Sequence, residues 1–192
     1  MPTPNPAALD FLLARRSRPA KTLDLPVPDR AALEPILQAA LRSPDHGKLE
    51  PWRLIVLERT ALLRLGRLAA DRGAALGKSE PEIAKQRSQY DDSHLAVAVI
   101  AVPQDSDKIP VVEQTLSAGA VCLGLLNAAL AAGWGANWLT GWASQDADFM
   151  REGLDLDANE WVAGLIHLGT ERVTPPERPR PDMAAKVSWL SA

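Results

Sequence analysis

The spacing of hydrophobic residues predicts a series of amphipathic helices. Leu9, Leu12 and Leu13 lie on one face of a helix over residues 7–16. Asp29 is a suitable N-cap for a helix to about residue 42, which Pro35 either kinks or restricts to a later start near residue 34. Further helices are predicted at residues 60–77, capped by Thr60, at 79–90 and at 144–153. The second of these begins with a Ser-x-x-Glu capping box at residues 79–82.

The remaining apolar runs predict short strands at residues 53–58, 95–102, 137–142 and 161–169. The nearly continuous apolar run at 95–102 is typical of a strand that is covered on both faces. Residues 110–132 form a long apolar helix ended by Gly133, and its content of Ala, Gly, Ser and Asn favours burial over a membrane span. Strands that interleave with helices in this way predict an α+β fold with three α/β/α layers.

Composition narrows the class of protein. The chain has 192 residues, a net charge of -3 and 46% hydrophobic residues, which suits one domain over residues 1–192 with a proline-rich arm at about 173–192. The absence of a basic excess argues against a nucleic-acid binder. Cys122 is the single cysteine and lies in an apolar run, so it is expected to be buried. The first residues show no signal-peptide pattern, which makes the cytoplasm the expected location.

The first candidate site is the sequence Arg15-Arg16-Ser17 at the end of the first predicted helix. Two guanidinium groups beside a hydroxyl can bind a dianionic phosphate through charge-assisted hydrogen bonds. The same arginines would also be favoured at a helix C-terminus by the helix dipole, without any ligand.

The second candidate site is the polar loop over residues 42–52, which leads into the first core strand. Arg42 could add a phosphate contact, His46 could hydrogen-bond to a heterocycle, and Lys48 could add charge. A solvated loop with Trp52 packed in the core fits the same residues.

The third candidate site is the Gly- and Trp-rich stretch at residues 133–142, which holds Trp138, Leu139 and Thr140. Glycines allow close backbone approach and tryptophans offer flat apolar faces, so a planar ring system would suit the stretch. Tryptophans at a buried dimer interface would give the same pattern. Elsewhere the chain has no dinucleotide fingerprint, P-loop or nucleophile elbow, and its three histidines lack metal-ligand spacing.

These elements, in this order, resemble the nitroreductase-like FMN-dependent oxidoreductase superfamily over nearly the whole chain. The matching features are an Arg-Arg-Ser element after the first helix, a loop ending in Pro-Trp, a long buried helix and a strand ending in Leu168-Gly169-Thr170. The loop residues Pro44-Asp45-His46 and Glu50-Pro51-Trp52 are similar to a short bacterial branch whose members carry the label putative NAD(P)H nitroreductase.

The resemblance implies a mixed central sheet flanked by helices in an intertwined homodimer, with FMN sites at the subunit interface. It implies FMN as the cofactor and a two-step hydride transfer from NAD(P)H through flavin N5 to a nitroaromatic, a quinone or another electron-poor acceptor, so that no catalytic side chain is needed. Implied FMN contacts are Arg15, Arg16, Ser17, Arg42, His46, Trp138, Leu139 and Thr140, although Leu139 stands where that branch often has a basic residue. Other flavin chemistry, including dehydrogenation or dehalogenation, and a non-enzymatic FMN-binding dimer are the alternatives.

Overall fold

The computed structural model describes residues 3–191, so Met1, Pro2 and Ala192 of the predicted domain lie outside the described residues. At its centre is a sheet of five strands, in which β1 (Leu23–Asp24), β5 (Trp161–Glu171), β3 (Leu95–Ala101) and β2 (Trp52–Glu58) follow one another, and β4 (Gly135–Leu139) also pairs with β5. All of these pairings are antiparallel, whereas the resemblance implied a mixed sheet. Within one chain the sheet is therefore antiparallel.

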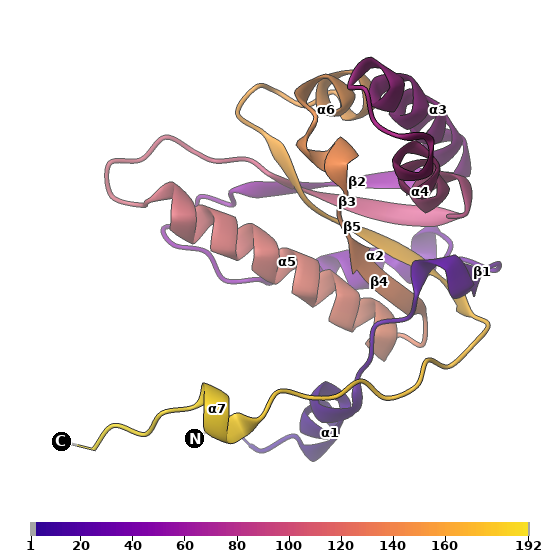
Figure 1. Ribbon diagram of the computed structural model, residues 1–192. Coiled ribbons are helices and arrows are strands. Elements are labelled where there is room, and N and C mark those ends of the chain that lie inside the picture. The colour runs from indigo at the N-terminus through magenta and orange to yellow at the C-terminus, as the bar shows by residue number, and fades with distance from the viewer. Residues whose placement is uncertain (1–2, 192) are drawn as a thin grey trace.

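Helices cover both faces of the sheet, which confirms the predicted α/β/α layers (Figure 1). Helices α2 (Arg30–Ala40) and α5 (Val111–Ala131) lie on one face, and α3 (Arg59–Ala75), α4 (Glu80–Asp91) and α6 (Ala147–Leu154) lie on the other. Along β3, Val97 and Val99 pack in the first layer while Ala98 and Ile100 pack in the second. Because both faces of β3 are buried, its sequence is apolar at every position rather than alternating.

Several predicted helix boundaries change in the structure. Helix α1 (Pro6–Ala14) ends before Arg15, and α2 begins at Arg30 and continues through Pro35, so the later start is wrong. Helix α3 already includes Arg59, which places Thr60 inside its first turn rather than at its cap. The capping box of α4 is confirmed, since the Ser79 amide donates to Glu82 Oε2 at 3.0 Å.

The segment after β4 also departs from the prediction. Strand β4 ends at Leu139 rather than at Trp142, which instead begins the short 3-10 helix η2 (Trp142–Gln145). Helix α6 follows, and the Asp146 side chain caps it by accepting a hydrogen bond from the Phe149 amide at 2.8 Å. A second 3-10 helix, η1 (Ala20–Thr22), immediately precedes β1.

Helix α5 is long and apolar enough to cross a membrane, but its inner side is packed on the sheet as part of the core. Burial of the whole helix was predicted from its sequence, in a core or in an interface, and the single chain covers only the inner side. Val111, Val112, Leu116 and Leu123 are all exposed in the single chain. The helix therefore presents an apolar outer face that the chain itself does not cover.

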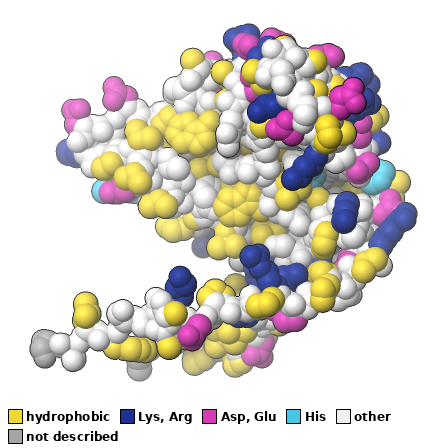
Figure 2. Space-filling view, in the orientation of Figure 1, with side chains coloured by type: hydrophobic (Ala, Val, Ile, Leu, Met, Phe, Trp, Pro, Cys, Tyr) yellow, Lys and Arg dark blue, Asp and Glu magenta, His cyan; other side chains and the backbone are white. Residues whose placement is uncertain are grey.

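Helix α1 and the C-terminal arm (residues 172–191) lie apart from the layered body. No residue of α1 is buried, and its leucines Leu9, Leu12 and Leu13 are exposed. The arm is extended through its prolines, as predicted, and then forms the short helix α7 (Met183–Lys186). The arm passes α1 at the edge of the molecule, and a hollow separates them from part of the body (Figures 1 and 2).

Candidate functional site

The Arg-Arg-Ser element lies in extended backbone directly after α1, where its side chains are partly buried. The Arg15 Nη2 donates to Ser17 Oγ at 3.1 Å. The Nε atoms of Arg15 and Arg16 are both buried and have no hydrogen-bond partner among the described residues. Leaving buried cationic donors unpaired is costly, so the element is suited to an anion that would accept from them.

The electrostatics of the Arg-Arg-Ser element also favour an anion. Burial lowers the pKa of Arg15 most, and the positive charges of Arg180, Arg16 and Arg18 lower it further. Arg18 is neutralised by Glu171, at 2.9 Å from its Nε. Arg180 comes from the proline-rich arm, where its Nε lies 2.8 Å from Glu177 Oε1, and it is not among the site residues predicted from the sequence. We refer to Arg15, Arg16 and Arg180 as the arginine cluster.

Strand β4 is held beside Arg18, directly after the Arg-Arg-Ser element, by one backbone hydrogen bond and one side-chain hydrogen bond. The Arg18 amide donates to the Ala136 carbonyl at 2.8 Å, and the Asn137 side-chain amide donates to the Arg18 carbonyl at 2.6 Å. Two candidate sites that are more than a hundred residues apart in the sequence, around Arg15 and around Trp138, are therefore brought together.

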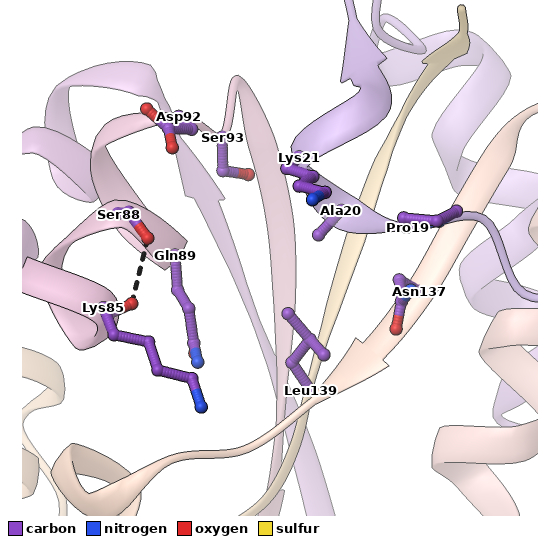
Figure 3. A pocket seen from close by; sticks show the side chains of 10 residues that line it. All are labelled: Pro19, Ala20, Lys21, Lys85, Ser88, Gln89, Asp92, Ser93, Asn137 and Leu139. Atoms are coloured by element: carbon purple, nitrogen blue, oxygen red, sulfur yellow. Dashed lines mark hydrogen bonds between the residues drawn. The ribbon is translucent and has the colours of Figure 1, made fainter. Parts of the chain in front are cut away.

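A cavity of about 350 Å³ opens next to this junction, and we call it the β4 cavity. Figure 3 shows Lys85 and Gln89 of α4 on one side, Lys21 and Asn137 on the other, and Leu139 between them. A neighbouring cavity of about 250 Å³ shares Lys85 and Gln89 and reaches Thr140 and Gly141. Lys21, Lys85 and Gln89 were not singled out from the sequence, because their positions in η1 and α4 carry no local motif.

Strand alternation divides the predicted β4 residues between two faces. Leu139 faces the β4 cavity, whereas Trp138 pairs with Ile166 of the α5 layer, and its indole lies where a side chain on Gly164 would be. Trp138 is 37% exposed on that side. Within one chain, the side chains of Leu139 and Trp138 therefore lie on opposite faces of β4 and do not line the same cavity.

The turn after β4 is fixed by a close contact with α4. Gln86 is buried, and its Oε1 lies so near Gly141 that a Cβ there would overlap with it. The same Oε1 accepts from the Ala143 amide at 3.5 Å. A larger residue at 141 would therefore require the Gln86 side chain to move.

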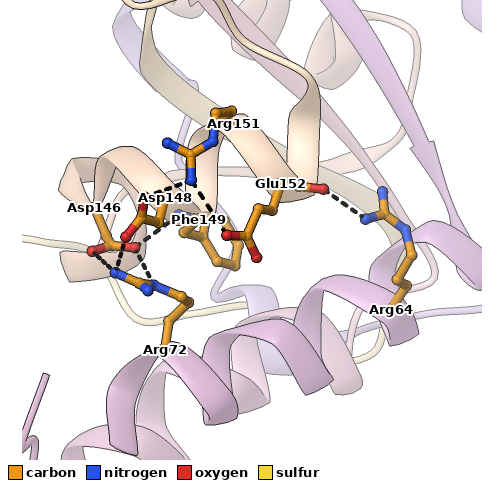
Figure 4. A network of polar contacts seen from close by, with 7 residues as sticks. All are labelled: Arg64, Arg72, Asp146, Asp148, Phe149, Arg151 and Glu152. Carbon is orange, nitrogen blue, oxygen red and sulfur yellow. Dashed lines mark hydrogen bonds and ion pairs between the residues drawn. The ribbon is translucent and has the colours of Figure 1, made fainter. Parts of the chain in front are cut away.

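A salt-bridge network ties the following residues to α3 (Figure 4). Arg72 donates to Asp146 at 2.8 and 3.1 Å and lies 2.6 Å from Asp148, which also pairs with Arg151. The hydrogen bonds from Arg72 hold the pKa of Asp146 below its usual value. The network anchors the start of α6, and every charge in it has a partner of opposite sign.

His46 and Arg42 lie elsewhere in the chain. His46 Nδ1 is 2.8 Å from Glu113 Oε2 in the first turn of α5, beside a cavity of about 410 Å³ that shares no lining residue with the β4 cavity. Arg42 is exposed in the turn after α2. Within residues 3–191, no hydrogen bond or ion pair joins either side chain to the arginine cluster or to β4. The chain thus carries two separate groups of predicted site residues.

Two further titratable groups are buried outside these sites. Burial raises the pKa of the Cys122 thiol to about 12, as expected for a cysteine in the core. Burial also lowers the pKa of His167 to about 4, so this histidine is neutral near pH 7 and its Nδ1 lies 2.9 Å from Ser93 Oγ.

The family model described as Nitroreductase family matches residues 12–170. The chain belongs to this family. It is 31% identical over 166 residues to the putative NAD(P)H nitroreductase YdjA of Escherichia coli strain K12, covering 86% of this chain and 89% of that protein. It is 34% identical over 165 residues to a putative NAD(P)H nitroreductase of Haemophilus influenzae, covering 85% and 88%.

Solved structures share the nitroreductase fold over the full chain. A nitroreductase-like family protein from Bacillus cereus superposes with a TM-score of 0.79 at 20% identity, covering 100% of both chains. A putative nitroreductase from Desulfovibrio desulfuricans, solved in complex with FMN, superposes with a TM-score of 0.74 at 19% identity, covering 99% and 100%. The predicted α+β, nitroreductase-like fold is thereby confirmed, and the predicted intertwined homodimer stays a prediction.

Proposed function

We propose that this member of the nitroreductase family is an FMN-dependent NAD(P)H oxidoreductase that works as a homodimer. The observation that carries the proposal is the pair Arg15 and Arg16, whose buried Nε atoms have no partner among the described residues. The pair lies shortly before Pro19, Ala20 and Lys21, which line the β4 cavity. The family membership, the names of the relatives and the FMN-bound neighbour support the cofactor and the electron donor.

The residues of the candidate site fit both the phosphate and the ring of FMN. The positive charges of Arg16, Arg18 and Arg180 all act on Arg15, and of these Arg18 and Arg180 pair with Glu171 and Glu177. Neither Arg15 nor Arg16 has an acidic partner among the described residues, and a phosphate monoester, which carries close to two negative charges at neutral pH, would supply one. Ser17 adds a hydroxyl beside Arg15. The adjoining β4 cavity offers an apolar side chain, Leu139, together with polar donors for a heterocyclic ring.

The chain's own residues would bind and orient the cofactor. The arginine cluster and Ser17 would hold the phosphate, while Leu139, Thr140 and the rigid turn at Gly141 would line one side of the ring. When bound, the cofactor would supply the redox chemistry, which is hydride transfer from NAD(P)H and reduction of an acceptor such as a nitroaromatic or a quinone. This division of labour explains why no acid–base pair is needed beside the cavity.

A second copy of the chain accounts for the two separate groups of site residues. The outer face of α5, the leucines of α1 and the C-terminal arm are apolar surfaces that one chain leaves exposed; their members include Leu9, Leu12, Leu13, Val112, Leu116, Leu123, Met183, Trp189 and Leu190. Exposed apolar surface of this extent marks a protein interface. We infer that the partner subunit supplies Arg42 and His46 to the site built on the arginine cluster.

The absorption spectrum of the purified protein tests the cofactor assignment. We expect a yellow protein that bleaches when NADH or NADPH is added without oxygen. A protein that is colourless and takes up no added FMN would overturn the proposal. A yellow protein that neither NADH nor NADPH reduces would be an FMN-binding protein, and this result would refute the proposed oxidoreductase activity.

Mixed dimers test the shared site. R15A/R16A and R42A/H46A should each bind FMN poorly, but a heterodimer of the two has one site in which all four residues are intact. Random mixing should therefore restore FMN to about a quarter of the sites if they are intersubunit. No recovery, in a mixture shown by mass spectrometry to contain heterodimers, would place all four residues in sites within one chain.

A further inference from the structure

The contact between His46 and Glu113 joins the candidate loop to α5 by side chains that lie 67 residues apart in the sequence. Both groups are exposed, the His46 side chain by 60% and the Glu113 side chain by 46%. Exposed ion pairs add little to stability, about 1 kcal/mol or less. The pair therefore has little value as a device for holding the fold together.

The backbone next to His46 is fixed independently of this pair. The Ser117 hydroxyl donates to the Pro44 carbonyl at 2.9 Å and accepts from Trp52 Nε1 at 3.0 Å. The Glu50 amide donates to Asp45 Oδ2 at 2.9 Å. Lys48 and Glu50 adopt left-handed backbone with φ of 56° and 47°, conformations that such residues rarely take without a structural constraint. What remains free at His46 is the orientation of its ring.

Helix α5 supplies the group that removes this freedom. Glu113 and Ser117 are four residues apart, so they lie on the same face of α5, one turn from each other. Ser117 holds the backbone before His46 and Glu113 holds its ring. Glu113 also lies in the first turn of α5, where the helix dipole favours a carboxylate.

The chemistry of the contact determines which ring nitrogen is left for a ligand. A carboxylate can only accept, so the hydrogen in this contact is on Nδ1 of His46. Nε2, on the opposite side of the ring, is then the atom that can meet another molecule. Carboxylates that bond one nitrogen of a functional histidine fix its tautomer and its orientation in this way.

We propose that Glu113 is a positioning residue, which orients His46 so that Nε2 is presented to the cofactor site of the partner subunit. The proposal rests on the proposed function, in which His46 is a cofactor contact. Glu113 itself makes no contact with the cofactor and acts through the imidazole.

The variants E113Q and E113A test this role against H46A and the double variant H46A/E113Q. Glutamine can accept from or donate to Nδ1, so it no longer selects one tautomer. We expect E113Q and E113A to weaken FMN binding about three- to tenfold, as measured by quenching of flavin fluorescence, which is the size of effect of about one hydrogen bond. E34Q, which removes an exposed carboxylate from an ion pair on α2, is the matched control and should bind FMN normally.

Two readouts separate positioning from other roles. Nitrogen-15 spectra of the three histidines should show His46 protonated on Nδ1 in the wild type and as a mixture of tautomers in E113Q, with H46A assigning the resonance. In the H46A background E113Q should have no further effect on FMN binding. A further loss there would show that Glu113 acts directly and would overturn the positioning role.

The outcomes also separate this inference from the proposed function. A wild-type protein that takes up no FMN would overturn the proposed function, and with it the proposal that His46 contacts the cofactor. A protein that binds FMN equally well with and without the Glu113 carboxylate would overturn only the role of Glu113. Unchanged melting temperatures in the E113Q and E113A variants would exclude misfolding as the cause of weaker binding.

Discussion

Two groups of arginines in this molecule are built in opposite ways. Arg72 lies among Asp146 and Asp148, and its bonds to Asp146 are bidentate (Figure 4). Arg15 lies among Arg16, Arg18 and Arg180, and its Nε has no partner in residues 3–191. The first group is complete within the chain. In the second, Arg18 and Arg180 pair with Glu171 and Glu177, whereas Arg15 and Arg16 have no acidic partner among the described residues.

The difference indicates what each group is for. Arginine remains protonated at any ordinary pH, so a cluster of arginines cannot relieve its repulsion by losing a proton. Such a cluster costs free energy in the empty protein and recovers it when an anion binds. The Arg72 network, in contrast, stabilises the empty protein and has no bonding capacity left for a ligand.

Removing the arginine cluster should give the largest effect on ligand binding. We expect R15A/R16A to weaken FMN binding at least a thousandfold, roughly 4 kcal/mol, because two charge-assisted contacts are lost. The apoprotein should melt at the same temperature as the wild type or higher, because repulsion is relieved. Fluorescence titration and calorimetry of the apoprotein measure the two quantities.

Substitution with lysine distinguishes charge from geometry at the same positions. R15K/R16K keeps both charges but loses the planar donors, so its affinity should lie between those of the wild type and R15A/R16A. If R15A/R16A destabilises the apoprotein and leaves FMN affinity unchanged, the cluster is structural and the contrast with Arg72 disappears.

Much of the fold follows from local sequence signals. The capping box at Ser79, the N-cap at Asp29 and the uninterrupted apolar run of β3 each act through neighbouring residues, and each prediction is confirmed. The failures are at positions that distant contacts decide. Strand β4 ends at Leu139, two residues before Gly141 contacts Gln86 of α4, and no pattern within residues 135–142 predicts that contact.

The candidate site divides along the same line. The Arg-Arg-Ser element and the β4 stretch could be proposed from their composition, and the structure places them side by side. Lys21, Lys85 and Gln89 reach the β4 cavity only because η1 and α4 converge on β4. The roles of all these residues remain predictions until FMN binding is measured. The exposed outer face of α5 shows why a single-chain pattern could not place Arg42 and His46: apolarity alone does not tell core from interface.

His167 differs from both groups of arginines, because a buried histidine can lose its proton and so avoid burying a charge. Its pKa falls from 6.5 to about 4 in the folded protein, so between these values the unfolded chain binds more protons and stability rises with pH. Acidification from pH 6.5 to 4 should therefore cost the wild type roughly 3 kcal/mol through this group alone. In H167Q that part of the slope should be absent.

Urea unfolding of the apoprotein across this pH range, followed by tryptophan fluorescence, measures the slope. The comparison of interest is the difference between wild type and H167Q at each pH, because other groups contribute equally to both. Parallel curves for the two proteins would mean that His167 is not the buried neutral base inferred from its surroundings.

Substitutions in the Arg72 network should have the smallest effects on stability and on FMN binding. D146A removes both the bidentate partner of Arg72 and the N-cap of α6, and loss of the cap alone should lower the free energy of unfolding by about 1–2 kcal/mol. The pKa of Asp146 is held low, so this stabilisation is present at neutral pH and is lost as the pH falls below the usual value of 3.8. D148A, which removes a more exposed partner, is the control and should cost less.

The FMN affinity of D146A and D148A should stay within about twofold of the wild-type value, near the limit of what ordinary surface substitutions change. If affinity falls together with stability, the network also sets the position of the Thr140–Trp142 turn, and the two groups of arginines are coupled rather than separate in function.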